Sequence, residues 1–150
     1  GRDFFQERQS LAAGAGAGLA QFVGALQRCV LLIEFAEGFQ VVIARGELVE
    51  IGGGFRVPDI MEQSGAKMVE IGTTNRVHLK DYAQAINENT AAILVVHRSN
   101  FALLGFTTQP SIKALGELAT NSQVIYFTHH DHLVDVARVA IGEELSVIQL

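Results

Sequence analysis

The chain has 150 residues, the length of one ordinary domain with one sizeable core and too short for two large domains. Its residues are 49% hydrophobic and 18% charged, which excludes a disordered chain or an acidic tail. The formal charge of -5 is opposite to the basic charge typical of an autonomous nucleic-acid-binding domain. The single cysteine, Cys29, excludes an internal disulfide and a zinc site of several cysteines, and it fits a reducing compartment.

Residues 1–38 form a divergent, Gly/Ala-rich segment. Alternating Ala and Gly at 12–18 are compatible with a closely packed helix or with a glycine loop at a helix start, and they match no complete phosphate-binding motif. The most apolar stretch, 11–26, is shorter than the roughly 20 residues of a membrane span, so we expect no membrane segment. The chain begins with Gly1 and carries no secretory signal pattern, which leaves open a trimmed, tagged or incomplete product.

From Phe39 onward, short apolar runs alternate with amphipathic segments. The runs are typical of strands buried on both faces and lie at 41–44, 67–71, 91–96 and 124–127. Helices are expected between them, at 57–64, 79–87 and 111–120. Pro58 suits a first helical turn, Gly65 suits a helix end, and Pro110 precedes the third helix. This order predicts an α/β fold with a mainly parallel sheet and helices packed on it.

Polar clusters follow all four predicted strands, where open α/β sheets bind their ligands. They are Arg45-Gly46-Glu47, Gly72-Thr73-Thr74-Asn75-Arg76, His97-Arg98-Ser99-Asn100 and Thr128-His129-His130-Asp131-His132. In a parallel sheet they share one edge, whose guanidinium, hydroxyl and amide groups suit phosphate or carboxylate oxygens. The alternative is that residues such as Thr74 and Asn75 are ordinary turn or capping residues.

The histidines at 129–132 do not form a recognised metal motif. They follow a strand too closely to converge on one ion, so we expect a solvated loop and no metal site. Cys29 lies in an apolar run without a base nearby and is expected to be a buried structural thiol. The chain contains no GxSxG or other nucleophile motif.

The segment 41–61, VVIARGELVEIGGGFRVPDIM, resembles the L-seryl-tRNA(Sec) selenium transferase family, the bacterial selenocysteine synthases. The resemblance runs over about residues 41–135, through EIGTTNR, HLKDY, AINENT, VH, SNF, GFT and LVD. Runs of this length are stronger evidence than a short motif.

The resemblance implies a pyridoxal 5′-phosphate (PLP) enzyme with the fold of type I transferases, so we expect a partial three-layer sandwich from the large domain. Family members convert seryl-tRNA(Sec) to selenocysteinyl-tRNA(Sec) with selenophosphate, as homo-oligomers in the cytoplasm. By resemblance, the cofactor-binding residues are Arg45, Glu47, Ser99 and Asn100. The substrate or active-site edge comprises Thr73, Thr74, Asn75, Arg76 and His97.

The chain also departs from the family pattern. The family's Schiff-base lysine lies in a Ser-Gly-Asp-Lys motif, and Lys67, Lys80 and Lys113 have no such context. Phe127 stands where the acidic partner of the pyridine nitrogen is expected, and Arg98 replaces a threonine. We therefore expect residues 1–150 to be one incomplete large domain, a fragment or degenerate member that is inactive alone. The alternative is a non-catalytic α/β module that binds anions or partner chains through this edge.

Overall fold

The computed structural model describes residues 38–51, 54–98, 101–119, 123–128, 130–141 and 147. The strands are β1 (Gln40–Ala44), β2 (Glu50–Ile51), β3 (Phe55–Arg56), β4 (Lys67–Ile71), β5 (Thr90–Val96) and β6 (Gln123–Phe127). The helices are the 3-10 turn η1 (Arg45–Glu47), α3 (Val57–Gln63), α4 (Leu79–Ala85), α5 (Ile112–Leu118) and α6 (Asp131–Ile141). The four predicted strands and three predicted helices are confirmed, with ends that differ by one or two residues.

Four strands form one parallel sheet in the order β4-β1-β5-β6. Val42 pairs with Val69 of β4 and with Ile93 of β5, and Val96 pairs with Phe127 of β6. After β1 the chain forms β4 on one side of it, and then crosses to form β5 on the other side of β1 and β6 next to β5. The sheet therefore has a topological switch point between β1 and β5, and ligands of open α/β sheets bind beyond the strand ends at such a point.

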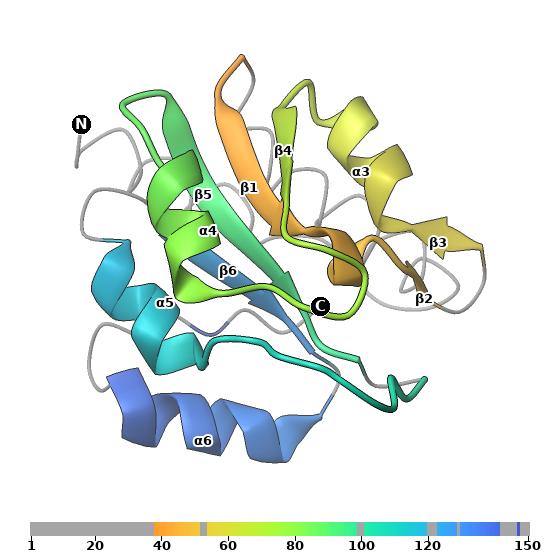
Figure 1. The fold of residues 1–150 in the computed structure, drawn as a ribbon, viewed down its shortest axis with the longest axis vertical. Coiled ribbons are helices and arrows are strands. Elements are labelled where there is room, and N and C mark those ends of the chain that lie inside the picture. Colours follow the sequence, from red (N-terminus) through yellow and green to blue (C-terminus); the bar gives the residue numbers. More distant parts are fainter. Residues whose placement is uncertain are drawn as a thin grey trace, which may run out of the picture.

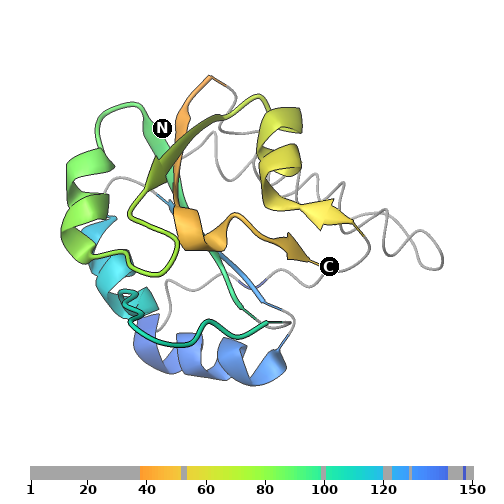
Figure 2. The ribbon, with the colours of Figure 1, turned by 45° about the vertical axis from the view of Figure 1, so that its right-hand side comes forward.

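Helices cover both faces of this sheet and give the predicted three-layer sandwich (Figures 1 and 2). On one face, Ile60 and Met61 of α3 pack with Val41 and Leu94. On the other face, Tyr82 of α4 and Leu115 of α5 belong to a core cluster with Val42, Ile93 and Val95. Because alternate residues of β1 and β5 enter opposite cores, both strands are apolar after their first residues, Gln40 and Thr90.

The helix boundaries follow the local signals in the sequence. Pro58 lies in the first turn of α3, and Gly65 follows this helix with a φ of +70°, a left-handed conformation that glycine adopts without strain. Ser111 caps α5, where its hydroxyl oxygen accepts the Ala114 N–H at 3.2 Å.

Two features differ from the sequence prediction. Asp131 and His132 lie in α6, which corrects the expectation of a loop across residues 129–132. The apolar residues of 133–141 extend this helix, which packs beside α5. Strands β2 and β3 form a two-stranded antiparallel sheet that we did not predict, because strands of two residues show no periodicity.

Several predictions concern residues outside the described part of the chain. These are the predictions for residues 1–37, including Cys29, and for Ser99, Asn100 and His129. Within the described ranges, no helix has the length and apolar character needed to cross a membrane.

Candidate functional site

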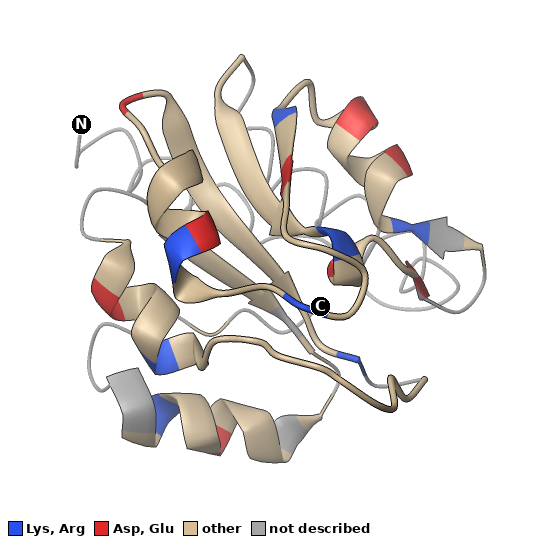
Figure 3. Cartoon of the chain, viewed as in Figure 1, with Lys and Arg blue, Asp and Glu red and all other residues tan. Residues whose placement is uncertain are grey.

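The carboxyl ends of the four parallel strands lie at one edge of the sheet, as predicted. Arg45 follows β1, Gly72 follows β4, His97 follows β5 and Thr128 follows β6. Figure 3 shows basic segments after β1 and β5 and in the loop after β4. The edge thus carries positive charge from three loops, although the whole chain is acidic.

On the β1 and β4 side, the predicted residues bond mostly to one another. Arg45 forms an ion pair with Glu70 of β4. The Thr73 hydroxyl donates to the Arg76 carbonyl at 3.0 Å and accepts the Arg76 N–H at 3.2 Å, which closes a turn. The Asn75 amide donates to the Phe106 carbonyl. Thr73 and Asn75 therefore shape this loop and join it to the segment before α5.

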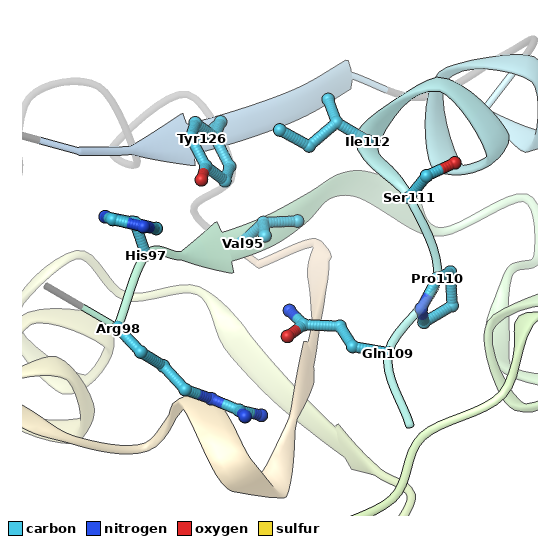
Figure 4. A pocket seen from close by; sticks show the side chains of 8 residues that line it. All are labelled: Val95, His97, Arg98, Gln109, Pro110, Ser111, Ile112 and Tyr126. Carbon is cyan, nitrogen blue, oxygen red and sulfur yellow. The ribbon is translucent and has the colours of Figure 1, made fainter. Parts of the chain in front are cut away.

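A cavity of about 310 Å³ lies on the other side, where β5 and β6 end beside the segment that leads into α5. Figure 4 shows its walls. The polar and aromatic lining residues are His97, Arg98, Gln109, Ser111 and Tyr126, and the apolar ones are Val95, Pro110 and Ile112. Its volume lies at the lower end of the range found for small-molecule sites, and its lining mixes polar and apolar groups.

Glu47 lies at the switch point beside this cavity and is completely buried. Its Oε2 atom accepts the Val96 N–H at 3.4 Å, and its Oε1 atom accepts a hydrogen bond from the Gln109 amide. Burial raises the pKa of Glu47 to about 8, although the Val96 hydrogen bond and the Arg98 charge oppose this rise. At neutral pH, Glu47 is therefore mainly protonated, and it joins the end of β1 to the end of β5 and to the cavity wall.

Two buried polar atoms near Glu47 have no hydrogen-bond partner among the described residues: the Tyr82 hydroxyl and the Nε atom of Arg98. Burial, with a contribution from Glu47, raises the pKa of Tyr82 well above its usual range. Burial and Glu47 also raise the pKa of Tyr126. Both phenols are therefore neutral at pH 7, whereas the guanidinium of Arg98 is always charged.

His97 lies among other rings at the end of β5. Its Nδ1 atom is 3.4 Å from the Thr128 hydroxyl. The centre of its ring lies 6.2 Å from the centre of the Tyr126 ring and 5.2 Å from that of the His130 ring, which it meets edge to face. The histidine pair comes from two loops that are distant in sequence, and the described residues contain no group of three or more side chains arranged for a metal ion.

The structure divides the predicted site residues into two groups. His97 lines the cavity and Glu47 supports its wall through Gln109. Arg45 and the 73–76 loop lie on the β1 and β4 side, and the cavity lining does not include them. Sequence reasoning missed Gln109, Ser111 and Tyr126; the position of the first two directly before a helix was the available signal.

The described residues at the cavity fit an anionic group but do not fit covalently held PLP. The cofactor needs a lysine amine and a charged partner for its pyridine nitrogen. Lys67 starts β4 at the opposite edge, Lys80 lies in α4, and Lys113 of α5 lies 3.9 Å from Glu117. None of these lysines lines the cavity, and β6 ends in Phe127 rather than in an acidic residue.

Comparison with known proteins identifies the family of this chain. The family model described as L-seryl-tRNA selenium transferase matches residues 11–150, which extends the recognised resemblance at both ends. Among similar curated proteins, the L-seryl-tRNA(Sec) selenium transferase of Haemophilus ducreyi is 53% identical over 143 residues, which are 87% of this chain and 31% of the relative. That of Haemophilus influenzae (strain PittEE) is 48% identical over 120 residues, 79% of this chain and 26% of the relative.

A solved structure confirms the fold class. The structure of D-glucosaminate-6-phosphate ammonia-lyase matches with a TM-score of 0.52 and 20% sequence identity, over 80% of this chain and 42% of that chain. At this identity the likeness concerns the fold alone. The chain spans 26% to 31% of the length of the two transferases named above. Because the family model and these relatives match most of its residues, the chain belongs to the L-seryl-tRNA selenium transferase family.

Proposed function

We propose that this chain is part of the large domain of a PLP-dependent transferase that converts seryl-tRNA(Sec) to selenocysteinyl-tRNA(Sec) with selenophosphate. Family membership supports the reaction class. The carboxyl edge of the sheet supports the location of the site, with Arg45, Glu47, Thr73, Thr74, Asn75, Arg76 and His97 lining or supporting it. A homo-oligomer in the cytoplasm is proposed on the same resemblance.

We also propose that the 150-residue chain does not catalyse this reaction alone. The observation that carries this proposal is the cavity at the ends of β5 and β6, which has polar groups but no lysine among its lining residues. Without an amine near the cofactor, no covalent attachment forms and the cofactor chemistry has no anchor.

Borohydride reduction tests this proposal. The chain is incubated with PLP, reduced and digested, and each lysine peptide is quantified by mass spectrometry. We expect weak labelling spread over the lysines, at the level found for the same chain unfolded in urea, and no selenocysteinyl-tRNA(Sec) when seryl-tRNA(Sec) and selenophosphate are added. Stoichiometric labelling of one lysine, lost on its replacement by Arg, would contradict the proposed inactivity.

A further inference from the structure

Arg98 carries a positive charge that the described residues do not neutralise. Its Nε atom is shielded from solvent and has no hydrogen-bond partner there, and Arg98 takes part in no ion pair among these residues. One terminal nitrogen of the guanidinium lies against Gly46, 3.3 Å from where a Cβ atom would be. A buried Nε–H without an acceptor lowers the stability of the fold, while the side chain as a whole is only half-buried and lines the cavity, where a ligand can reach it.

The groups packed around Arg98 do not compensate this charge at neutral pH. Glu47 from η1 interacts with it electrostatically but retains its proton, because burial raises its pKa to about 8. Tyr82 of α4 and Tyr126 of β6 are neutral phenols with raised pKa values. The neighbouring ring of His97 adds no negative charge.

The cavity beside Arg98 has both polar and apolar walls. Gln109 provides an amide, while Val95 and Ile112 provide apolar surface (Figure 4). The Ser111 hydroxyl is turned toward α5, where its oxygen accepts the Ala114 N–H and caps the helix (Figure 4). The volume of about 310 Å³ suits a small organic molecule rather than a single ion.

We propose that this cavity binds a small organic oxyanion, a phosphate ester or a carboxylate, whose charged group pairs with Arg98 and whose apolar body lies against Val95 and Ile112. The guanidinium fork matches two oxygens of either group in a charge-assisted pair. The proposal does not depend on selenium transfer. It locates the anion site, which the sequence predicts only for the whole edge of the sheet, in the cavity beside Arg98.

Calorimetric titration of the full 150-residue chain at pH 7 tests the proposal with phenyl phosphate, benzoate and phenol. We expect phenyl phosphate or benzoate to bind, the tighter of the two identifying the charged group, and phenol to bind at least about tenfold more weakly because it lacks the charge. Binding of neither anion, or binding of phenol as tight as that of the anions, would overturn the proposal without affecting the lysine-labelling result.

Variants identify the residue responsible. Arg98→Gln is expected to weaken binding of the anion by about tenfold or more, and Arg98→Lys to recover part of the loss because it keeps the charge. Lys113→Gln is the matched control, since it removes an exposed positive charge from α5 outside the cavity lining. Equal affinity of Arg98→Gln and the unchanged chain, with circular dichroism showing the same fold, would overturn the proposal.

The pH dependence gives a second measurement. As pH rises through about 8, Glu47 loses its proton and its charge offsets that of Arg98, so affinity for the anion falls. Glu47→Gln keeps an uncharged group of the same shape and is expected to remove this fall. An affinity that is constant with pH in the unchanged chain would contradict the role given to the uncompensated Arg98 charge.

Discussion

Gly46 lies where two loops meet, and its lack of a side chain allows that contact. A Cβ atom at this position would lie 2.5 Å from the backbone carbonyl oxygen of Thr74. We expect Gly46→Ala to lower the free energy of unfolding by about 1–3 kcal/mol, because one of the two backbone segments has to shift. Urea unfolding followed by circular dichroism measures the change.

The control for this substitution is Gly116→Ala in α5. A Cβ atom at Gly116 meets nothing within 4 Å, and alanine favours the helix. We expect Gly116→Ala to raise the free energy of unfolding by about 0.5–1 kcal/mol. If the two alanine variants had equal stability, the close approach of Gly46 to the loop after β4 would be refuted.

Tyr82 combines a well-packed ring with a hydroxyl that has no partner among the described residues. We expect Tyr82→Phe to raise the free energy of unfolding by about 1 kcal/mol, because it removes a buried unpaired polar group and keeps the ring. Tyr82→Ala is expected to lower it by about 3 kcal/mol or more by opening a cavity. Thermal unfolding of both variants measures these changes, and a clear loss of stability in Tyr82→Phe would argue against an unpaired hydroxyl.

At the scale of elements, the helices α3, α4 and α5 have seven residues each, too short to be stable alone. Their stability comes from packing on the sheet and, in α4 and α5, from side-chain caps at the helix start. In α4, the Asp81 carboxylate accepts the His78 N–H at 2.8 Å and so satisfies one backbone donor of the first turn. This bond fixes the point at which the chain turns from the 73–76 loop into the helix.

Asp81→Ala is expected to lower the free energy of unfolding by about 1 kcal/mol, through loss of this cap and of a negative charge at a helix start. Lys80→Ala, which changes the exposed neighbour in the same turn, serves as the control and should stay within about 0.5 kcal/mol of the unchanged chain. Hydrogen exchange at the amides of α4 gives a local measurement; equal exchange in both variants would show that the Asp81 cap does not stabilise the helix.

For the whole molecule, Glu47 makes stability depend on pH. Its pKa rises from an ordinary 4.5 to about 8 on folding. Between these values the unfolded carboxyl is ionised while the folded one keeps its proton, so the free energy of unfolding falls as pH rises, and it levels off above about 8. The slope from this one group is at most about 1.4 kcal/mol per pH unit.

Glu47→Gln is expected to remove this contribution, because the amide does not titrate. Urea unfolding of both proteins at a series of pH values gives the difference, in which the effects of other groups largely cancel. The stability of Glu47→Gln relative to the unchanged chain should increase with pH up to about 8. Parallel stability curves would show that Glu47 is ionised in the folded chain.

The predictions that succeeded rest on local patterns. The run at 91–96 is apolar throughout because β5 is covered on both faces. Pro58 lies in the first turn of α3 and Gly65 follows its end, as the backbone preferences of proline and glycine predict. Helix α6 was missed although residues 133–141 are rich in apolar side chains, because the histidines before them directed the interpretation to a loop. Gln109 offered only its position shortly before a helix, and Tyr126 offered no signal and was recognisable as a cavity residue only in three dimensions.

The sequence by itself determined the α/β class, the position of each strand of the parallel sheet and membership in the transferase family, because these depend on residue periodicity and on long matching runs. The tertiary structure decided which charges meet. Arg45 pairs with a residue 25 positions away and Glu47 bonds one 62 positions away, whereas Arg98 finds no ion pair among the described residues. These contacts follow from the strand order β4-β1-β5-β6, which brings distant loops to one edge and which local periodicity does not encode.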